Sequence, residues 1–265
     1  MQFEKMIFEK EKGVGSLTLN NPQKLNAMTT EMWRDLRLVL DAIHNDEEIK
    51  VLVITGDGPA FCSGSDVSGR LASRFSKQKI EKTHKELLEP VGYVAYLIRS
   101  LEIPIIAAIN GTAAGAGLSL ALLCDIRIAS EQAKFSAVWV RVGLIGDLGA
   151  TYLLPRIVGP SKALELFITG NMIDANEAER IGLVTKVVAP NELMPTSKQI
   201  AIELAKGPLV AIKLMKRAVY KGINNDLLTQ LDFESYAQNV CRNTKDHREG
   251  VKAFIEKREP QFKGT

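Results

Sequence analysis

The sequence predicts an α/β fold over the first two thirds of the chain and a helical region after it. Short apolar runs that end in glycine, such as KVLVITG, are typical of buried strands. Segments with apolar residues at helical spacing alternate with these runs, and from Pro190 onward the helical spacing dominates. The 265 residues, 46% of them hydrophobic and 25% charged, provide one large domain with a sizeable buried core.

The N-terminal part begins with a β-hairpin. Residues 3–10 and 14–20 are the two strands, and the Lys-Gly pair between them provides the turn. A helix is expected from about Thr30, followed by the strand KVLVITG and by a turn-rich loop over residues 56–69. Residues 77–100 again have helical spacing. The apolar face of the first helix consists of Met32, Leu36, Val39, Leu40 and Ile43.

The central part of the chain alternates strands with helices. IIAAIN predicts a strand, GAGLSLALL opens a helix directly after it, and DIRIAS predicts a third strand, followed by extended chain from Phe135 to Val140. Asp174 and Glu177 have capping-box spacing and predict the start of another helix. VTKVV is the one late strand, and the segments LVAIKLMKRAVYKG, LLTQLDFESYAQNV and HREGVKAFIEKR predict helices.

Charge and cysteine content argue against several classes of partner. The formal net charge of +3 arises from acids and bases mixed along the chain, and no basic run suggests a nucleic-acid partner. The longest apolar stretch is broken by Asn110 and several glycines, so it predicts strand, turn and helix rather than a membrane span. Cys62, Cys124 and Cys241 are too few and too widely spaced for a disulfide framework or a metal site, and they favour a reducing, cytoplasmic location.

The glycine-rich segment GTAAGAGLS lies where a strand is followed by a helix. It lacks the third glycine of a dinucleotide-binding motif and the Gly-Lys-Ser/Thr of a phosphate loop, so both nucleotide-binding interpretations are rejected. Small residues at Gly115, Ala116 and Gly117 allow close approach of the main chain, and the N–H groups of a helix start stabilise negative charge. Tight packing of the helix on the strand is the alternative for this segment.

A second main-chain donor is expected in the segment FCSGSD. A glycine turn at Gly64 would present the amide of Ser65 toward the same point as the helix start. Two such amides form an oxyanion hole, in which one donor contributes about 2.7–4 kcal/mol in acyl-transfer enzymes. Without the other loop, FCSGSD is an ordinary surface turn.

Asp147 is the one carboxylate in the apolar segment VGLIGDLGATYLLP. A charged group in such surroundings is usually paired or functional. One interpretation makes Asp147 the N-cap of a helix over residues 148–154, since aspartate is common at that position. The other makes it a catalytic carboxylate, with Trp139 as a pocket wall. Plain core packing is the alternative for Trp139.

Three ordered segments, FCSGSD, IPIIAAINGTAAGAGLSLALLCDIRIAS and AKFSAVWVRVGLIGDLGATYLLPRIVG, resemble the crotonase (enoyl-CoA hydratase/isomerase) superfamily. The N-terminal NNPQKLNAMT and the C-terminal HREGVKAFIEKREPQF extend the resemblance over nearly the whole chain. It implies a spiral of ββα units over residues 1–195 that holds an acyl-CoA site. It also implies a helical oligomerisation region over residues 196–265 that builds trimers or dimers of trimers. The implied substrate is an acyl-coenzyme A thioester, with no metal or redox cofactor, because coenzyme A is part of the substrate.

The resemblance also implies the residues of the site. The amides of Ser65 and Ala116 correspond to the oxyanion hole, and an alanine side chain leaves the amide donor unchanged. Phe254 and Lys257 resemble C-terminal residues that reach the coenzyme, in some members from a neighbouring subunit. The other residues expected to contact the acyl-CoA are Lys24, Leu25, Ala27, Ser63, Gly64 and Asp66 at the adenine and phosphate end, together with Gly115, Ser119 and Trp139.

The chain departs from the hydratases of the family at the two positions where they have glutamates. Those positions hold Ser119 and Trp139, and neither side chain transfers protons as a carboxylate does. This difference argues against water addition. Isomerases of the family, including 1,2-epoxyphenylacetyl-CoA isomerase, have an aspartate where Asp147 stands. The family's 4-chlorobenzoyl-CoA dehalogenase has both that aspartate and a tryptophan where Trp139 stands.

The expected function is therefore isomerisation of an acyl-CoA, in which a double bond shifts or a strained ring rearranges through a thioester enolate. Asp147 is the expected acid/base, with its pKa raised by desolvation from Leu144, Ile145 and Leu148. Two alternatives stay open: Asp147 as the nucleophile of a dehalogenase or thioester hydrolase, and a non-catalytic coenzyme A-binding protein. The acyl group, whose pocket walls are expected within residues 70–100, and the choice between fatty-acid and aromatic-acid degradation stay open as well.

Overall fold

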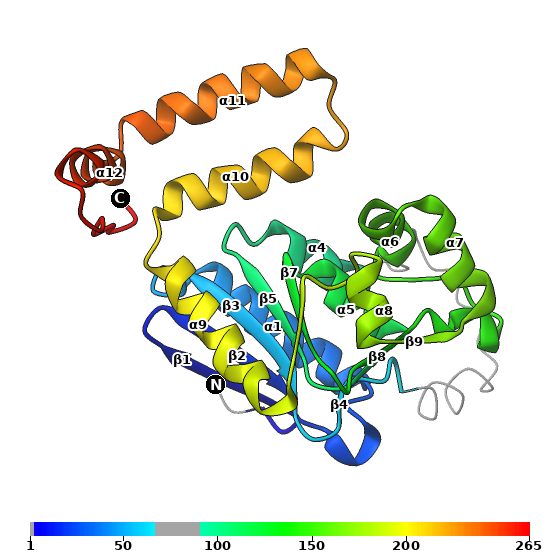
Figure 1. Cartoon of the computed structure of the whole chain (residues 1–265). Helices are drawn as coiled ribbons and strands as arrows, with labels where there is room; N and C mark the ends of the chain where they lie inside the picture. Colours follow the sequence, from blue (N-terminus) through cyan, green and yellow to red (C-terminus); the bar gives the residue numbers. More distant parts are fainter. Residues whose placement is uncertain (1–2, 67–90) are drawn as a thin grey trace.

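The computed structural model describes residues 3–66 and 91–265, and within them the chain forms two β-sheets flanked by helices (Figure 1). β1 and β9 pair antiparallel with their neighbours, and the other neighbouring strands pair in parallel. The larger sheet has the order β1 (Met6–Glu11), β2 (Val14–Leu19), β3 (Val51–Gly56), β5 (Ile105–Ile109), β7 (Ile126–Ser130) and β10 (Lys186–Val188). The smaller sheet has the order β4 (Ala60–Cys62), β6 (Thr112–Ala114), β8 (Lys134–Ser136) and β9 (Met172–Asp174).

Successive strands alternate between the two sheets, and this alternation generates a spiral. β3, β5 and β7 lie in the larger sheet, and β4, β6 and β8, which follow them in the chain, lie in the smaller one. A helix comes after each pair: α4 (Val91–Ser100), α5 (Ala116–Leu123) and α6 (Ala150–Val158). Parallel strands require such crossover connections. The repeated ββα unit confirms the predicted α/β spiral.

Both faces of the larger sheet are buried, which explains the uninterrupted apolar runs of its strands. In β3, Leu52 and Ile54 join the main core, whereas Val51 and Val53 join a second core beneath α9 (Leu193–Ala205). Strands that are covered on both faces lack the polar alternation of half-exposed strands. The run KVLVITG therefore fills two cores with alternate side chains.

Most of the predicted elements are present. β1 and β2 form the hairpin, and the predicted apolar face of α1 (Thr30–His44) is buried. The helix predicted over residues 77–100 is confirmed for α4, and its first part lies outside the described residues. The segment after Pro190 is mainly helical, with α9, α10 (Leu209–Gly222), α11 (Leu227–Arg242) and α12 (Lys245–Glu256).

Two local predictions differ from the structure. The extended chain expected over residues 135–140 ends at Ser136, because the chain then turns into a 3-10 helix, η2 (Val138–Val142). β9 is a second late strand that the sequence analysis did not identify. It has three residues, too few for a periodic pattern to be read from the sequence.

The segment that contains β9 joins α7 (Pro160–Thr169) to α8 (Ala175–Arg180). Asp174 is the N-cap of α8 as predicted, and its carboxylate accepts the Glu177 N–H at 2.8 Å. The Glu177 carboxylate, however, binds a guanidinium on its own helix instead of completing the capping box.

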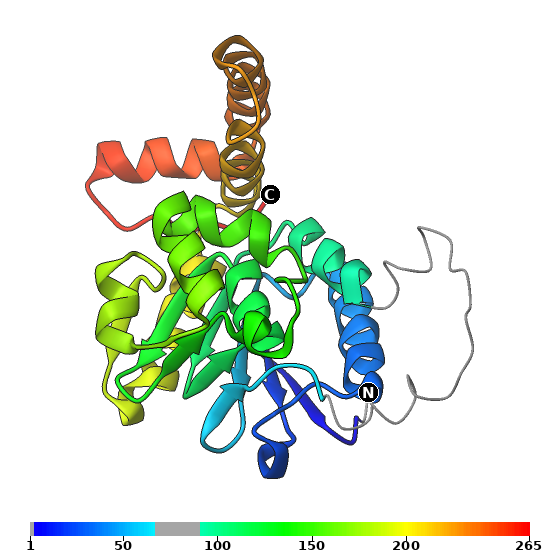
Figure 2. The same cartoon turned by 90° about the vertical axis from the view of Figure 1, so that its right-hand side faces the viewer.

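The last three helices form an arm that leaves the body of the molecule (Figures 1 and 2). α9 packs on the larger sheet through Leu193 and Ala201, so it belongs to the body. α10 and α11 run away from the sheets as an antiparallel pair, and α12 lies at the end of the arm. The boundary expected between residues 195 and 196 falls inside α9, and the structure places the start of the arm at α10.

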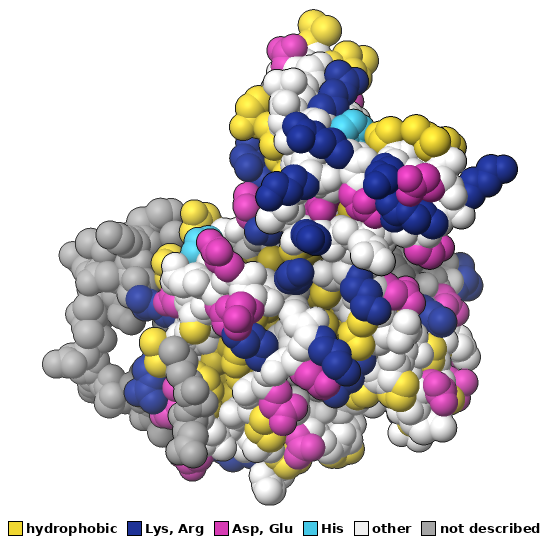
Figure 3. Space-filling view, turned by 90° about the vertical axis from the view of Figure 1, so that its left-hand side faces the viewer, with side chains coloured by type: hydrophobic (Ala, Val, Ile, Leu, Met, Phe, Trp, Pro, Cys, Tyr) yellow, Lys and Arg dark blue, Asp and Glu magenta, His cyan; other side chains and the backbone are white. Residues whose placement is uncertain are grey.

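The surface combines mixed charge with apolar side chains on the arm. Acidic and basic side chains are interspersed over the face shown in Figure 3. On the arm, Leu227, Leu228, Phe254 and Ile255 are 72%, 75%, 85% and 73% exposed. Adjacent exposed apolar side chains, such as Phe254 and Ile255 on α12, are typical of an interaction surface. Among the described residues, no helix is both long enough and apolar enough to cross a membrane.

The main chain of α5 lies directly against the main chain of β4. A Cβ atom on Gly117 would lie 2.0 Å from the Cys62 carbonyl oxygen and 2.7 Å from its carbonyl carbon. Since neither backbone can move away from a packed core, only glycine fits at this position. The tight-packing interpretation of the GAG segment is therefore right for Gly117.

Gly117→Ala is expected to lower the free energy of unfolding by at least about 3 kcal/mol, because the added methyl group overlaps a main-chain carbonyl. Chemical denaturation of the two proteins measures the difference. Gly250→Ala is the matched control, since a Cβ there would lie 3.5 Å from the Phe262 ring, an ordinary contact. Equal stability of the Gly117 variant and the parent would contradict the packing described.

Candidate active site

Two glycine turns meet at the N-terminal end of α5. One is the FCSGSD segment that follows β4, and the other is the GAG segment that precedes α5. A Cβ on Gly64 would lie 3.8 Å from Ala116 N, and a Cβ on Gly115 would lie 3.9 Å from Gly64 Cα. Both glycines have positive φ, +118° and +51°, a conformation that favours glycine. The turns are therefore in close contact, as the sequence predicts.

Among the described residues, the main-chain hydrogen bonds that hold the two turns do not involve the N–H groups of Ser65 and Ala116. Met28 N–H donates to Gly64 C=O at 2.8 Å, and Asp66 N–H donates to Met28 C=O at 2.9 Å. Alternate amides of extended chain face opposite sides, so the Ser65 N–H faces away from Met28. Ala116 is the first residue of α5 and has no acceptor within the helix. Among the described residues, neither amide has a main-chain acceptor, so both can bind a ligand oxygen.

α5 fixes the position of the Ala116 amide. Every residue of this helix is buried. Gly115 N–H, directly before it, donates to Ser136 C=O at 3.1 Å and ties the turn to β8. A helix start carries partial positive charge, so the Ala116 N–H lies where an anionic oxygen is stabilised.

The loop that carries Lys24, Leu25 and Ala27 lies against the turn from Ser63 to Asp66. Ser63 N–H donates to Leu25 C=O at 3.0 Å, and Lys24 Nζ forms an ion pair with Asp66 at 2.8 Å. The Lys24 side chain is 53% exposed, so its ammonium group is accessible to an anionic ligand group. Leu25 is exposed and Ala27 is half-buried. The structure thus brings together the residues expected at the coenzyme end of the site.

Asn26 holds this loop in place, and the sequence analysis did not identify it. The residue is fully buried with φ at +56°, a conformation that asparagine tolerates better than most residues. Its Nδ2 donates to the carbonyls of Asp57 and Ala60 at 2.8 and 2.7 Å, and its Oδ1 accepts the Asn21 N–H at 2.8 Å. The signal was present in NNPQKLN, because asparagines around a proline are typical of a turn that needs local side-chain bonds.

Asp147 is held by two of the residues that the sequence analysis selected. Trp139 Nε1 donates to Asp147 Oδ1 at 3.1 Å. Ser119 Oγ, buried in α5, donates to the main-chain oxygen of Asp147 at 3.0 Å. The Trp139 ring is itself packed on Phe167, with ring centres 5.9 Å apart. Ser119 and Ala116 are less than one turn apart, about 4.5 Å along the helix axis, so α5 links the carboxylate to the amide pair.

The capping interpretation of Asp147 is wrong. α6 begins at Ala150, and its N-cap is Gly149, which has φ at +81° and offers no side-chain bond. Asp147 contributes its carbonyl oxygen to the turn, accepting the Ala150 N–H at 2.9 Å. Its carboxylate is bound to the Trp139 indole, so it is oriented by the site rather than by the helix start.

The expected desolvation of Asp147 is only partly present in the single chain. Leu148 is buried, but Leu144 and Ile145 are 54% and 77% exposed, and Asp147 itself is half-buried. Leu144 N–H donates to Trp139 C=O at 3.0 Å, which closes a turn after η2 and leaves the two aliphatic side chains at the surface. Of the three residues expected to desolvate the carboxylate, only Leu148 is itself buried.

Phe254 and Lys257 do not join this site within one chain. Phe254 lies on α12 and is 85% exposed, and Lys257 is the C-cap residue of the same helix. Figure 1 places α12 at the end of the arm, away from β4 and α5. The pocket walls expected within residues 70–100 lie, up to residue 90, outside the described residues.

The cysteine beside the first turn is not a candidate nucleophile. Cys62 is fully buried, and burial raises the pKa of its thiol to about 12. Cys124 is buried with a pKa raised to about 12 for the same reason, and Cys241 is partly exposed. Within residues 3–66 and 91–265, no group of three His, Cys, Asp or Glu side chains has the geometry to hold a metal ion.

Comparisons with known proteins agree with this geometry. The sequence matches the family model described as Enoyl-CoA hydratase/isomerase over residues 9–265. It is 40% identical to the short-chain-enoyl-CoA hydratase of Clostridium acetobutylicum, with 97% of each chain covered. It is 38% identical to the 1,2-epoxyphenylacetyl-CoA isomerase of Escherichia coli, with 98% of this chain and 99% of the relative covered. The crystal structure of an enoyl-CoA hydratase/isomerase from Cupriavidus metallidurans CH34 is similar with a TM-score of 0.91 at 32% identity, covering 100% of this chain and 98% of that chain.

Ser119→Ala removes the hydroxyl group that joins α5 to the Asp147 loop. We expect the free energy of unfolding to fall by about 1–3 kcal/mol, because a carbonyl oxygen loses its donor. Ser197→Ala is the control, since the Ser197 hydroxyl is equally buried but has no partner among the described residues. Denaturant titration should show a loss for Ser119→Ala and no loss for Ser197→Ala, and equal values for the two would contradict the assignment.

Proposed function

The chain belongs to the enoyl-CoA hydratase/isomerase family, and from this premise we propose that it isomerises an acyl-CoA thioester. The reaction shifts a double bond, or rearranges a strained ring, through an enolate of the thioester. The observation that carries the proposal is the Asp147 carboxylate bound to Trp139 Nε1, on the loop that α5 ties to the amide pair. The names of the relatives include both hydratases and isomerases, so the proposal of isomerisation rests on the residues of the site rather than on those names.

The amides of Ser65 and Ala116 bind the thioester oxygen. Removal of a proton from the α-carbon, or from the γ-carbon when a double bond intervenes, moves negative charge onto that oxygen. Both N–H groups are fixed by main-chain bonds before the substrate binds, so no reorganisation is needed as the charge develops. Each donor of this kind contributes about 2.7–4 kcal/mol to the stabilisation of the transition state.

Asp147 is the acid/base of the proposal. In its ionised form it takes a proton from one carbon of the enoyl group, and the resulting carboxylic acid returns a proton to a different carbon. No water is consumed, so the product is an isomer of the substrate. The Trp139 indole is a donor only, so it orients the carboxylate without competing for the transferred proton. Trp139 is therefore a positioning residue.

The two positions at which the resemblance places glutamates in hydratases support isomerisation. Ser119 and Trp139 occupy them, and both bind Asp147. The two-glutamate mechanism of water addition needs a carboxylate at each position. A single base held by these two residues fits proton transfer within the substrate better than addition of water to it.

Asp147→Asn is expected to lower kcat by about 10²–10⁴-fold, because the amide cannot accept the proton. The measurement is turnover of a panel of short-chain and aromatic enoyl-CoA thioesters, with product isomers separated by chromatography. Asp41→Asn, on α1 with its side chain 44% exposed, is the control and should retain the parent rate. Full turnover by the Asp147 variant would remove the proposed base. The absence of turnover by the parent over the whole panel would favour a coenzyme A-binding protein without catalysis.

A second candidate function uses Asp147 as a nucleophile. The hydrogen bond from Trp139 favours this role, because it fixes the carboxylate. A fixed carboxylate can also attack an aryl or acyl carbon, as in dehalogenation or thioester hydrolysis. A single turnover in ¹⁸O-labelled water distinguishes the two roles. Label in the Asp147 peptide supports attack by the carboxylate, whereas deuterium in the product after reaction in heavy water supports proton transfer.

The arm supports a further part of the proposal, which is a homotrimer or a dimer of trimers. Phe254 and Lys257 are remote from the site of their own chain, and the apolar residues around them are exposed. A neighbouring copy would cover these residues and would receive Phe254 and Lys257 at the coenzyme end of its own site.

Subunit mixing tests whether the site is shared. Chains that carry Asp147→Asn are combined with chains that carry Phe254→Ser and Lys257→Glu, each inactive or weak at low substrate concentration. In a mixed oligomer, some sites receive an intact Asp147 from one chain and an intact arm from the other, so activity should rise above the sum of the separate preparations. Activity that stays at the sum would show that the arm serves no neighbouring site.

A further inference from the structure

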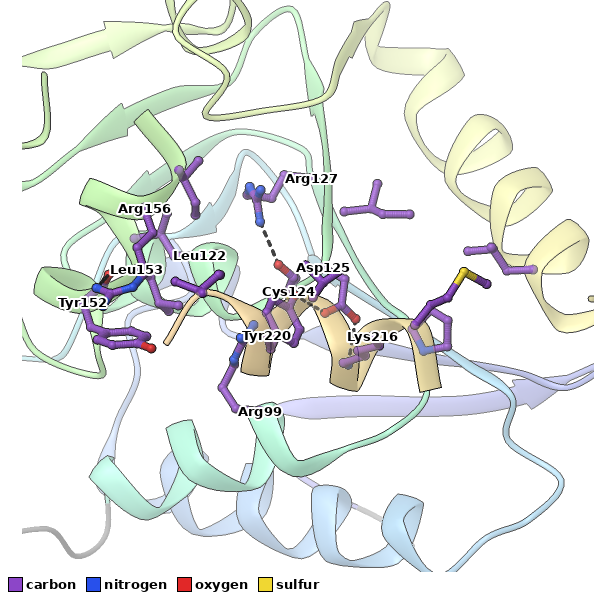
Figure 4. Close-up of a pocket in the computed structure, with 17 residues that line it drawn as sticks. Arg99, Leu122, Cys124, Asp125, Arg127, Tyr152, Leu153, Arg156, Lys216 and Tyr220 are labelled. Atoms are coloured by element: carbon purple, nitrogen blue, oxygen red, sulfur yellow. Dashed lines mark hydrogen bonds and ion pairs between the residues drawn. The ribbon is translucent and has the colours of Figure 1, made fainter. Parts of the chain in front are cut away.

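A cavity lies between the body and the first helix of the arm (Figure 4). Its volume is about 430 Å³, within the range of cavities that bind small molecules. Side chains from five helices line it: Arg99 lies in the last turn of α4, Leu122 belongs to α5, Arg156 to α6, Leu204 to α9, and Lys216 and Tyr220 to α10.

This cavity is separate from the candidate active site. The amide of Ala116 is at the first residue of α5, whereas Leu122 and Cys124, which line the cavity, are at the other end of the helix. The residues between them are fully buried. A ligand in the cavity would therefore lie on the far side of α5 from the oxyanion hole.

The acidic group of the cavity is already satisfied. Asp125 Oδ2 accepts the Ile105 N–H at 2.7 Å and binds Lys216 Nζ at 2.8 Å, and Asp125 Oδ1 accepts the Tyr220 hydroxyl. Lys216 also donates to the Ile103 carbonyl at 2.8 Å. Asp125 and Lys216 thus neutralise each other, and both carboxylate oxygens already accept hydrogen bonds.

Three guanidinium groups of the cavity wall lack an acidic partner. Of the described residues, none places a carboxylate within ion-pair distance of Arg99, Arg127 or Arg156. Arg127 is 8% exposed and donates to two main-chain carbonyls, at 2.6 and 2.7 Å. Burial also lowers its pKa. A buried cation without a counterion is costly, so the cavity carries an uncompensated positive charge.

Arg99 and Arg156 are held in a way that leaves their donors available. Arg99 Cζ lies 3.3 Å from the centre of the Tyr220 ring, and Arg156 Cζ lies 3.6 Å from the centre of the Tyr152 ring. Stacking uses the flat face of a guanidinium, and the N–H groups in its plane still match a carboxylate. Arg156 donates to the Tyr152 carbonyl at 2.9 Å and, at 3.5 Å, weakly to Asn224, so part of its fork is engaged.

The rest of the cavity wall is hydrocarbon. Apolar side chains from α6 and α10 face one another across the space, and water in contact with them is unfavourable. An occupant must therefore combine one anionic group with an apolar chain. The apolar residues of the wall include Leu122, Leu153, Ile157, Met215, Val219 and Ile223.

We propose that this cavity binds an amphiphilic carboxylate, such as a free medium-chain fatty acid. Arg99 and Arg156 hold the carboxylate, Arg127 contributes the buried positive charge, and the hydrocarbon chain lies against the apolar residues of α6 and α10. The carboxylate of such a ligand would pair with guanidinium groups that have no acidic partner among the described residues. Its hydrocarbon chain would cover the apolar side chains of the wall. The assignment does not depend on the reaction catalysed at the other end of α5.

The test is calorimetric titration of the full chain with decanoate, with saturating coenzyme A present to occupy the active site. We expect one decanoate bound per chain. Decanol, which lacks the charge, should bind at least about tenfold more weakly, since a charge-assisted hydrogen bond contributes that much. Acetate, which lacks the chain, should also bind at least about tenfold more weakly, because it buries little apolar surface. Arg99→Gln and Arg156→Gln should each weaken decanoate binding about tenfold.

Arg37→Gln is the matched control, because Arg37 also lies over a tyrosine ring, 5.1 Å from the centre of Tyr93, but outside the cavity. It should bind decanoate as the parent does, and thermal unfolding should show that all three variants are folded. Equal binding of decanoate and decanol, or equal binding by the Arg99 and control variants, would overturn the proposal. Tighter binding of decyl phosphate would assign the site to a phosphate instead. No binding, together with slow amide exchange at Val219 in the assembled protein, would show that a second copy fills the cavity.

Discussion

Close packing of main chain on main chain between successive turns of the spiral is the constraint on which the site depends. A Cβ on Gly111 would lie 2.0 Å from the Pro59 carbonyl oxygen, and a Cβ on Gly117 would lie equally close to that of Cys62. These contacts press β6 and α5 onto β4 without intervening side chains. As a result, the turn at Gly64 meets the turn at Gly115, and the main chain before Ser65 lies close to the Ala116 amide. Glycine at these points is thus required for the close approach of the two turns.

The carboxylate of the site is positioned by the same scaffold. Ser119 extends from α5 to the main chain of the Asp147 loop, and Trp139 binds the carboxylate itself. Because α5 carries both the Ala116 amide and the Ser119 hydroxyl, a shift of this helix would move the Ala116 amide and the Asp147 loop together. In the family resemblance these two positions are the places of catalytic glutamates. In this chain Ser119 and Trp139 occupy those two positions, and both bind Asp147. The same backbone can therefore carry an acidic group at a third position in place of the first two.

The sequence patterns predicted the alternation of strands and helices and the approach of the two glycine turns, the family resemblance added the spiral, and the reasons are physical. The apolar runs of β3 and β5 and the glycine turns at Gly64 and Gly115 are signals within short stretches of sequence. They can be recognised without knowledge of the tertiary contacts. The orientation of Asp147 is different, because it depends on Trp139 and Ser119, which approach it only after the chain has turned through η2 and α5. Capping was the plausible local alternative, and tertiary contacts excluded it. The exposure of Leu144 and Ile145 likewise depends on a turn closed by a main-chain bond, which no side-chain pattern reveals.

Asp125, a polar residue of the body, determines how the arm is placed and therefore which surface the arm exposes. α10 is attached to the body through Lys216 and Tyr220, both bound to Asp125, which follows α5 directly. This cluster is largely shielded from water, so loss of Asp125 would leave a buried ammonium without its counterion and the Tyr220 hydroxyl without its acceptor, a cost of several kcal/mol by general experience with buried pairs. The direction of α10 sets the direction of α11 and α12, and therefore where Phe254 and Ile255 are presented. The charged contacts at the base of the arm therefore determine where the exposed apolar side chains at its end are presented, and an exposed apolar surface of this kind is typical of an interaction site.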